Sequence, residues 1–186
     1  MAKKKREHRR SYLNDFKLNA AGKYEYFGNH YKWDDPHRSR RSMLILAWSV
    51  VAACSAVTVA SGCNTAAGMS NTFYVILPYV AEVASLFSVV WGACRLTFGG
   101  EPLREYIYRD TVLKLPTRSL LVAISALVGL VCSVVFILLN GFEGQVLLSV
   151  IHLLSKLAVA ALAMWMRRIW KCFNYRCDNL KKEPTE

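Results

Sequence analysis

Hydrophobic positions along this chain gather into four long blocks separated by short polar segments. The blocks are Met43–Ser61, Phe73–Cys94, Ser119–Leu139 and Val146–Met166. Each holds about 20 residues, the length that crosses a hydrocarbon core of about 30 Å as a helix. A soluble helical bundle would interrupt such blocks with charged residues at every turn. The pattern therefore predicts an all-α membrane protein with four transmembrane helices.

The positions of the basic residues predict how these helices are oriented. Of the 24 Lys and Arg residues, 12 precede the first block, 5 lie between the second and third, and 6 follow the fourth. The two remaining connections, 62–72 and 140–145, contain none. Because basic loops stay in the cytoplasm, we expect the N-terminal segment (1–42), the middle loop and the C-terminal extension (167–186) to be cytoplasmic. They flank a transmembrane domain over residues 43–166 of a multi-pass protein of the cell membrane.

The composition adds little that this topology does not explain. Of the 186 residues, 54% are hydrophobic, and the net charge is +11. The basic charge is accounted for by the positive-inside pattern and by attraction to anionic lipid headgroups. The basic opening stretch MAKKKREHRR is of a kind also found in nucleic-acid-binding tails, but we do not expect this chain to bind nucleic acid.

The N-terminal segment contains a pattern typical of a β-hairpin. Residues 23–33 alternate, and Gly28-Asn29 suits the centre of a type II′ turn. With that register Glu25 faces Lys32, while four aromatic residues share the other surface. These aromatic residues are Tyr24, Tyr26, Tyr31 and Trp33, with Tyr24 opposite Trp33 and Tyr26 opposite Tyr31. The alternative is a disordered basic tail with incidental aromatic residues.

The other two cytoplasmic segments also favour regular structure. In the middle loop, Pro102 suits the first position of a short interfacial helix that would end before Pro116. One side of it would carry four apolar or aromatic residues, namely Leu103, Tyr106, Ile107 and Leu113. After the fourth block, the mixture of aromatic and basic residues predicts that the last helix continues past the membrane.

Three ionisable residues interrupt the transmembrane blocks. Counting from the outer ends of their helices, Glu82 lies about 14 Å deep and Lys156 about 15 Å deep, and His152 lies one turn above Lys156 on the same face. Unpaired charges at this depth are costly, so we expect the three side chains to face the bundle interior and to pair. The cluster is either a structural ion pair, a proton or ion relay, or a contact with another subunit.

Small residues on the third block indicate close helix packing. Ser125, Gly129 and Ser133 follow one another at four-residue spacing. This pattern allows two helix backbones to approach closely in a membrane. It serves either the packing of this chain or contact with a partner's helix.

The cysteine residues indicate no metal site. Cys172 and Cys177 form a C-x4-C pair without a second pair, whereas a zinc site needs four ligands. Arg9-Arg10 and the ASGCN stretch around Cys63 loosely resemble export and lipoprotein signals, but we expect neither to be processed.

The sequence favours a non-catalytic accessory or assembly subunit of a larger membrane complex. The alternative is a small oligomeric transporter or channel for protons or ions that uses Glu82, His152 and Lys156. We expect no enzyme activity, because no nucleophile–base arrangement, metal cluster or phosphate loop is present. We also expect no cofactor. The expected partners are anionic lipids and either other membrane subunits or further copies of this chain.

Overall fold

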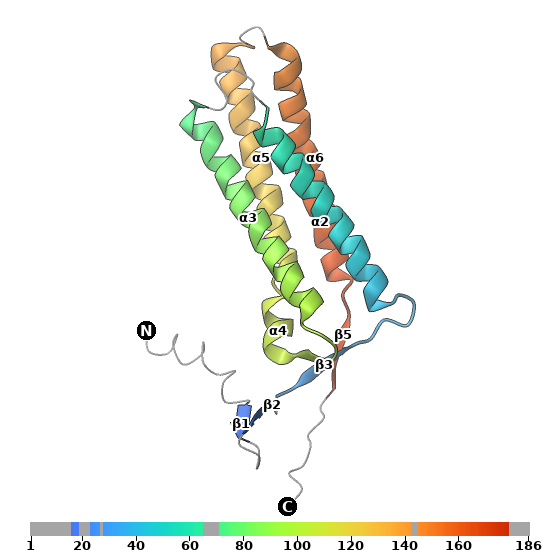
Figure 1. Cartoon of the computed structure of the whole chain (residues 1–186). Coiled ribbons are helices and arrows are strands. Elements are labelled where there is room, and N and C mark those ends of the chain that lie inside the picture. Colours follow the sequence, from blue (N-terminus) through green and yellow to red (C-terminus); the bar gives the residue numbers. More distant parts are fainter. Residues whose placement is uncertain (1–15, 19–22, 27, 65–70, 143–144, 179–186) are drawn as a thin grey trace, which may run out of the picture.

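Four long helices form the body of the protein. The computed structural model describes residues 16–18, 23–26, 28–64, 71–142 and 145–178. The helices are α2 (Arg40–Gly62), α3 (Phe73–Phe98), α5 (Leu115–Asn140) and α6 (Val146–Lys171). All four are long and apolar enough to cross a membrane. They run side by side as an up-and-down bundle (Figure 1).

Local signals set the ends of these helices. The Ser39 hydroxyl caps α2 by accepting a hydrogen bond from the Ser42 backbone N–H at 3.2 Å. Helix α5 is followed by Gly141, whose φ of 73° favours a residue without a side chain. The helices extend three to five residues beyond the apolar blocks at the end where the basic residues lie, so Arg40 and Lys171 are helical. Hydropathy alone predicts only the apolar length of each helix and misses the additional helical turn that contains charged residues.

The packing order of the helices places α3 and α6 diagonally across the bundle. Helix α5 packs between α3 and α6, and α2 packs chiefly against α6 and more lightly against α3. Gly129, in the middle of α5, lies against Pro78 of α3 and Lys156 of α6. The small side chains at this level bring the three helices together, as the spacing in the third block indicates.

A small three-stranded sheet joins three distant parts of the chain at one end of the bundle. Its order is β4 (Leu103–Arg104), β3 (His30–Trp33) and β5 (Tyr175–Asp178), all antiparallel. These strands come from before α2, after α3 and after α6, so the three segments lie on the same side of the bundle (Figure 1). We call this end the sheet end and the opposite end the far end.

The predicted hairpin over residues 23–33 is wrong. Strand β2 (Tyr24–Tyr26) pairs with β1 (Phe16–Leu18), with Phe16 opposite Tyr26, and not with β3. Glu25 is opposite Lys17, and Lys32 is opposite Arg176 of β5. Gly28 does not have the positive φ that a type II′ turn needs. The reason is that β3 satisfies its backbone groups on both edges with strands from distant segments, which local alternation cannot reveal.

Two further expectations need correction. The middle loop holds the short helix α4 (Glu105–Asp110) after strand β4, and Pro116 lies in the first turn of α5, where a missing N–H costs nothing. The last helix does not continue through residues 172–176; it ends at Lys171, and the chain turns into β5. Within the predicted N-terminal segment 1–42, residues 1–15, 19–22 and 27 lie outside the described residues, as do residues 179–186 of the C-terminal extension.

Oxidative cross-linking tests this strand arrangement. Tyr31 and Cys177 are paired across β3 and β5, so Tyr31→Cys is expected to form a disulfide with Cys177 under mild oxidation, in a chain with Cys172→Ser. The matched control is Tyr24→Cys in the same background, which should not cross-link. A gel-mobility shift measures the result. Cross-linking through Tyr24→Cys alone would contradict the sheet.

Candidate functional site: a buried ion pair in the bundle

Glu82 and Lys156 form an ion pair in the interior of the bundle. The Lys156 Nζ donates to Glu82 Oε2 at 2.9 Å, and both side chains are almost completely shielded, with 2% and 0% of their surface exposed. Glu82 comes from α3 and Lys156 from α6, so the pair spans the diagonal of the bundle. The depth argument from the sequence predicts such a contact, since each residue lies about halfway along its helix.

Neighbouring residues hold the lysine in place. The Lys156 ammonium lies 4.6 Å from the centre of the Tyr79 ring, a favourable cation–π distance. The lysine side chain passes beside Gly129 of α5, where a Cβ would lie in ordinary van der Waals contact with Lys156 Cε at 3.8 Å. The Tyr79 hydroxyl donates to the Thr58 carbonyl of α2 at 3.4 Å. All four helices therefore contribute to the surroundings of this charge.

His152 lies next to the pair but does not bridge it. His152 lies one helical turn further from the sheet end than Lys156. Its Nδ1 is 3.5 Å from the Ser61 hydroxyl oxygen of α2. The ring is buried and makes this contact between α2 and α6. The structure thus brings the three predicted residues to one region, with two of them in direct contact and His152 joined to a different helix.

Three buried polar atoms around the pair have no hydrogen-bond partner among the described residues. They are Glu82 Oε1, His152 Nε2 and Thr58 Oγ1. They belong to α3, α6 and α2 respectively. Buried polar groups normally have partners, and leaving one without costs about 1–3 kcal/mol. These atoms give the cluster an unused capacity to bind a proton or a polar group.

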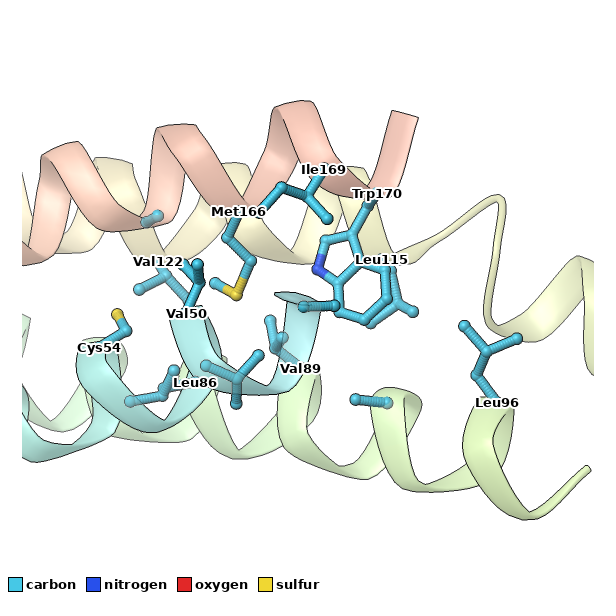
Figure 2. Close-up of a cluster of buried hydrophobic side chains, with 14 of the residues drawn as sticks. Val50, Cys54, Leu86, Val89, Leu96, Leu115, Val122, Met166, Ile169 and Trp170 are labelled. Atoms are coloured by element: carbon cyan, nitrogen blue, oxygen red, sulfur yellow. The ribbon is translucent and has the colours of Figure 1, made fainter. Parts of the chain in front are cut away.

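The interior is divided at the level of the ion pair. Between the pair and the sheet end, the buried side chains are almost all apolar, from Val50 and Cys54 on α2 to Met166 and Trp170 on α6 (Figure 2). The buried Ser119 in this half donates to the Leu115 carbonyl of its own helix. Between the pair and the far end lie most of the remaining buried polar side chains. These are Thr58, Ser61, Ser133, Ser149 and His152.

The other predicted residues are distributed over different contacts. On α5, Gly129 and Ser133 are buried and Ser125 is half-buried, and both serines donate to carbonyls of their own helix. The four predicted surface aromatic residues do not share one surface. Tyr24 is exposed, and the ring centre of Tyr26 lies 5.2 Å from that of Phe16. Tyr31 stacks on Tyr108 with 4.1 Å between the ring centres. Trp33 packs against Phe173 and Tyr175.

Sequence reasoning missed three residues around the ion pair. The ring of Tyr79 lies under the Lys156 ammonium. The backbone carbonyl of Thr58 accepts a hydrogen bond from the Tyr79 hydroxyl, and the Ser61 hydroxyl contacts His152. Tyr79 is three residues before Glu82 and shares its helix face, a signal that was present in the sequence. Among the residues that the structure describes, no group of three His, Cys, Asp or Glu side chains could hold a metal ion.

The four long apolar helices are compatible with a multi-pass membrane protein, and a small three-stranded sheet lies at one end of the bundle. No family model matches the chain, and neither curated proteins nor solved structures give a match to it.

Proposed function

We propose that this chain is a non-catalytic accessory or assembly subunit of a larger complex in the cell membrane. The observation that carries the proposal is the apolar half of the bundle between the Glu82–Lys156 pair and the sheet end. A charge or proton that reached the pair from the far end would meet mostly packed apolar side chains beyond it, and the buried Ser119 hydroxyl there is already bonded to its own helix. Passage through a single bundle is therefore not expected.

The ion pair has a structural role in this proposal. Two opposite charges at mid-bundle fix the relative heights of α3 and α6, because a shift of either helix would leave a charge unpaired in a low-dielectric interior. The bundle interior is then used for its own assembly. What the chain offers to other proteins is its outer surface and the sheet end.

The proposed orientation has the sheet end in the cytoplasm. Arg and Lys residues flank the helices at that end, which is the side where basic residues remain during insertion. Anionic lipid of the inner leaflet then faces these residues.

Thiol labelling in intact cells tests the orientation. An impermeant maleimide applied from outside is expected to label the exposed Cys63, which follows α2 at the far end. It should not label the exposed Cys172 next to the sheet until the cells are opened. Labelling of Cys172 but not Cys63 in intact cells would reverse the proposed orientation.

Isolation in a gentle detergent tests the accessory role. The tagged full chain is expected to bring down one or more other membrane proteins in fixed ratio, identified by mass spectrometry. A tagged, unrelated four-helix membrane protein of similar abundance is the control. Recovery of this chain only as a homo-oligomer would contradict the proposal.

A small proton- or ion-coupled transporter is the second candidate. The observation that favours it is the set of unpartnered atoms Glu82 Oε1 and His152 Nε2 beside the pair, because a carboxylate and an imidazole can exchange protons. This role is expected in an oligomer, because four helices enclose little room for a transport path. In that case Glu82→Gln would leave the amount of protein unchanged and abolish transport.

A further inference from the structure

A guanidinium group is held against the side of α3 at the start of α5. Arg118 donates from Nη1 to the Ser88 carbonyl at 2.9 Å. It reaches this position because Gly92 has no side chain: a Cβ at Gly92 would lie only 2.8 Å from the same nitrogen. Arg118 is half-buried, and its guanidinium has more N–H donors than the one that this hydrogen bond uses.

The charge of Arg118 is not compensated within the described chain. It forms no ion pair there, whereas its neighbours Arg95 and Lys114 both pair with Asp110, Arg95 at 3.3 Å. Lys114 lies one turn before Arg118, whose backbone N–H bonds to the Lys114 carbonyl at 2.9 Å. Arg95 is three residues after Gly92 on α3. We call Arg95, Lys114 and Arg118 the groove cluster: the first two pair with Asp110, and Arg118 pairs with no carboxylate among the described residues.

That carboxylate remains ionised. Partial burial alone would raise the pKa of the Asp110 carboxyl, but the hydrogen bonds and charges of Lys114 and Arg95 outweigh burial and hold the pKa below its usual value. The groove cluster therefore keeps an excess of positive charge at neutral pH. A half-buried, uncompensated guanidinium is a strong site for a phosphate group.

The position of the groove cluster indicates which phosphate it binds. The groove cluster lies where α3 ends and α5 begins, at the sheet end of the apolar segments. On α3 the indole of Trp91 is 59% exposed at this level, as in the aromatic belt of a membrane interface. Deeper in the membrane, Phe87 and Leu121 expose apolar side chains that acyl chains can cover. With α3 and α5 across a membrane, this is the level at which lipid headgroups are expected.

From these observations we infer that the groove cluster binds the phosphate of an anionic membrane lipid, with Arg118 as the main contact. The inference goes beyond the accessory role and does not depend on it. It predicts a site with a defined geometry, in which both the charge of Arg118 and the glycine at position 92 matter. Diffuse attraction of a basic surface to lipid would depend on neither.

Binding of phosphatidylglycerol to the purified full chain in detergent, followed by native mass spectrometry, tests the site. Arg118→Gln is expected to weaken binding about fivefold. The matched control Arg176→Gln removes the same charge from exposed strand β5 and should change binding less than twofold. Gly92→Ala keeps every charge but displaces the guanidinium, and should also weaken binding. Equal effects of Arg118→Gln and Arg176→Gln would overturn the inference.

Two further measurements distinguish an anionic lipid from free phosphate and from a partner protein. Glycerol phosphate and phosphatidylcholine should compete poorly, since one has no acyl chains and the other has no net charge. Equal binding of glycerol phosphate would show a site for free phosphate and overturn the lipid assignment. Loss of a co-purifying protein from Arg118→Gln, with unchanged lipid binding, would assign Arg118 to a partner's carboxylate instead. If Arg118→Gln does not fold, lipid binding is compared between the native chain, Gly92→Ala and Arg118→Lys. Both variants keep the net charge but alter the guanidinium contact, so both should bind the lipid more weakly.

Discussion

Replacing Lys156 with methionine is expected to destabilise the bundle strongly, because Glu82 would then be left without its partner in the interior. Breaking a buried ion pair by removing one member costs about 3–5 kcal/mol when the remaining group stays charged. Glu82→Gln should have a similar effect, since Lys156 keeps only the Tyr79 ring. Thermal unfolding in detergent and the amount of protein in the membrane measure the change.

The double variant separates a structural pair from a proton relay. Glu82→Gln combined with Lys156→Met leaves no charge to satisfy, so it should recover much of the stability lost in either single variant. The control is the pair of Glu105 and Arg109 on α4. Arg109 is 56% exposed and Glu105 also accepts from the Asn29 amide, so Arg109→Gln alone should cost less than about 1 kcal/mol. Additive losses in the double variant at the buried site would contradict the structural role.

Trp170→Ala is expected to have the second large effect. Trp170 is 2% exposed, belongs to the same buried cluster as Leu115 (Figure 2) and packs on Phe173 with 5.1 Å between the ring centres. It fills the junction between the apolar half of the bundle and the sheet end. Removing a buried tryptophan side chain costs about 3–5 kcal/mol, because the cavity cannot fully collapse. The loss should appear as a lower apparent melting temperature and as faster proteolysis at the sheet end.

Trp165 provides the control for this prediction. It is on the same helix, but 52% of it is exposed toward the outside of the bundle. Trp165→Ala should therefore change stability by much less. Trp170→Phe keeps most of the apolar volume and removes an indole N–H that has no partner among the described residues, so it should be close to neutral. Equal losses for Trp165→Ala and Trp170→Ala would contradict the packing at this junction.

The helices and the ion pair are the features that the sequence predicts well. Residues far apart in sequence, such as Glu82 and Lys156, could be matched because each helix crosses the same thickness of hydrocarbon, so position along the helix gives depth. Rotation about the helix axis followed from the cost of exposing a charge to lipid. His152 shows the limit of this argument. Depth and face placed it near the pair, but its partner Ser61 on α2 depends on the packing order of the helices.

The sheet could not be predicted in the same way. The Gly28-Asn29 stretch and its flanking aromatic residues suit a local hairpin, yet Tyr31 pairs with Leu103 and Cys177, each more than 70 residues away. These partners become neighbours only after the four helices bring three loops to one end of the bundle. Local pattern contains no information on that step. The contact of Arg118 with Ser88 escapes prediction for the same reason, since it depends on the room left at Gly92 of a neighbouring helix.

Proton flux through the purified chain in liposomes tests the central claim most directly. The apolar half of the bundle predicts that a pH gradient across such vesicles decays no faster than across empty ones, for both the native chain and Glu82→Gln. A pH-sensitive dye inside the vesicles measures the decay, and a proton ionophore added at the end shows that the gradient was present. Decay that is faster with the native chain and returns to the empty-vesicle rate in Glu82→Gln would contradict the claim.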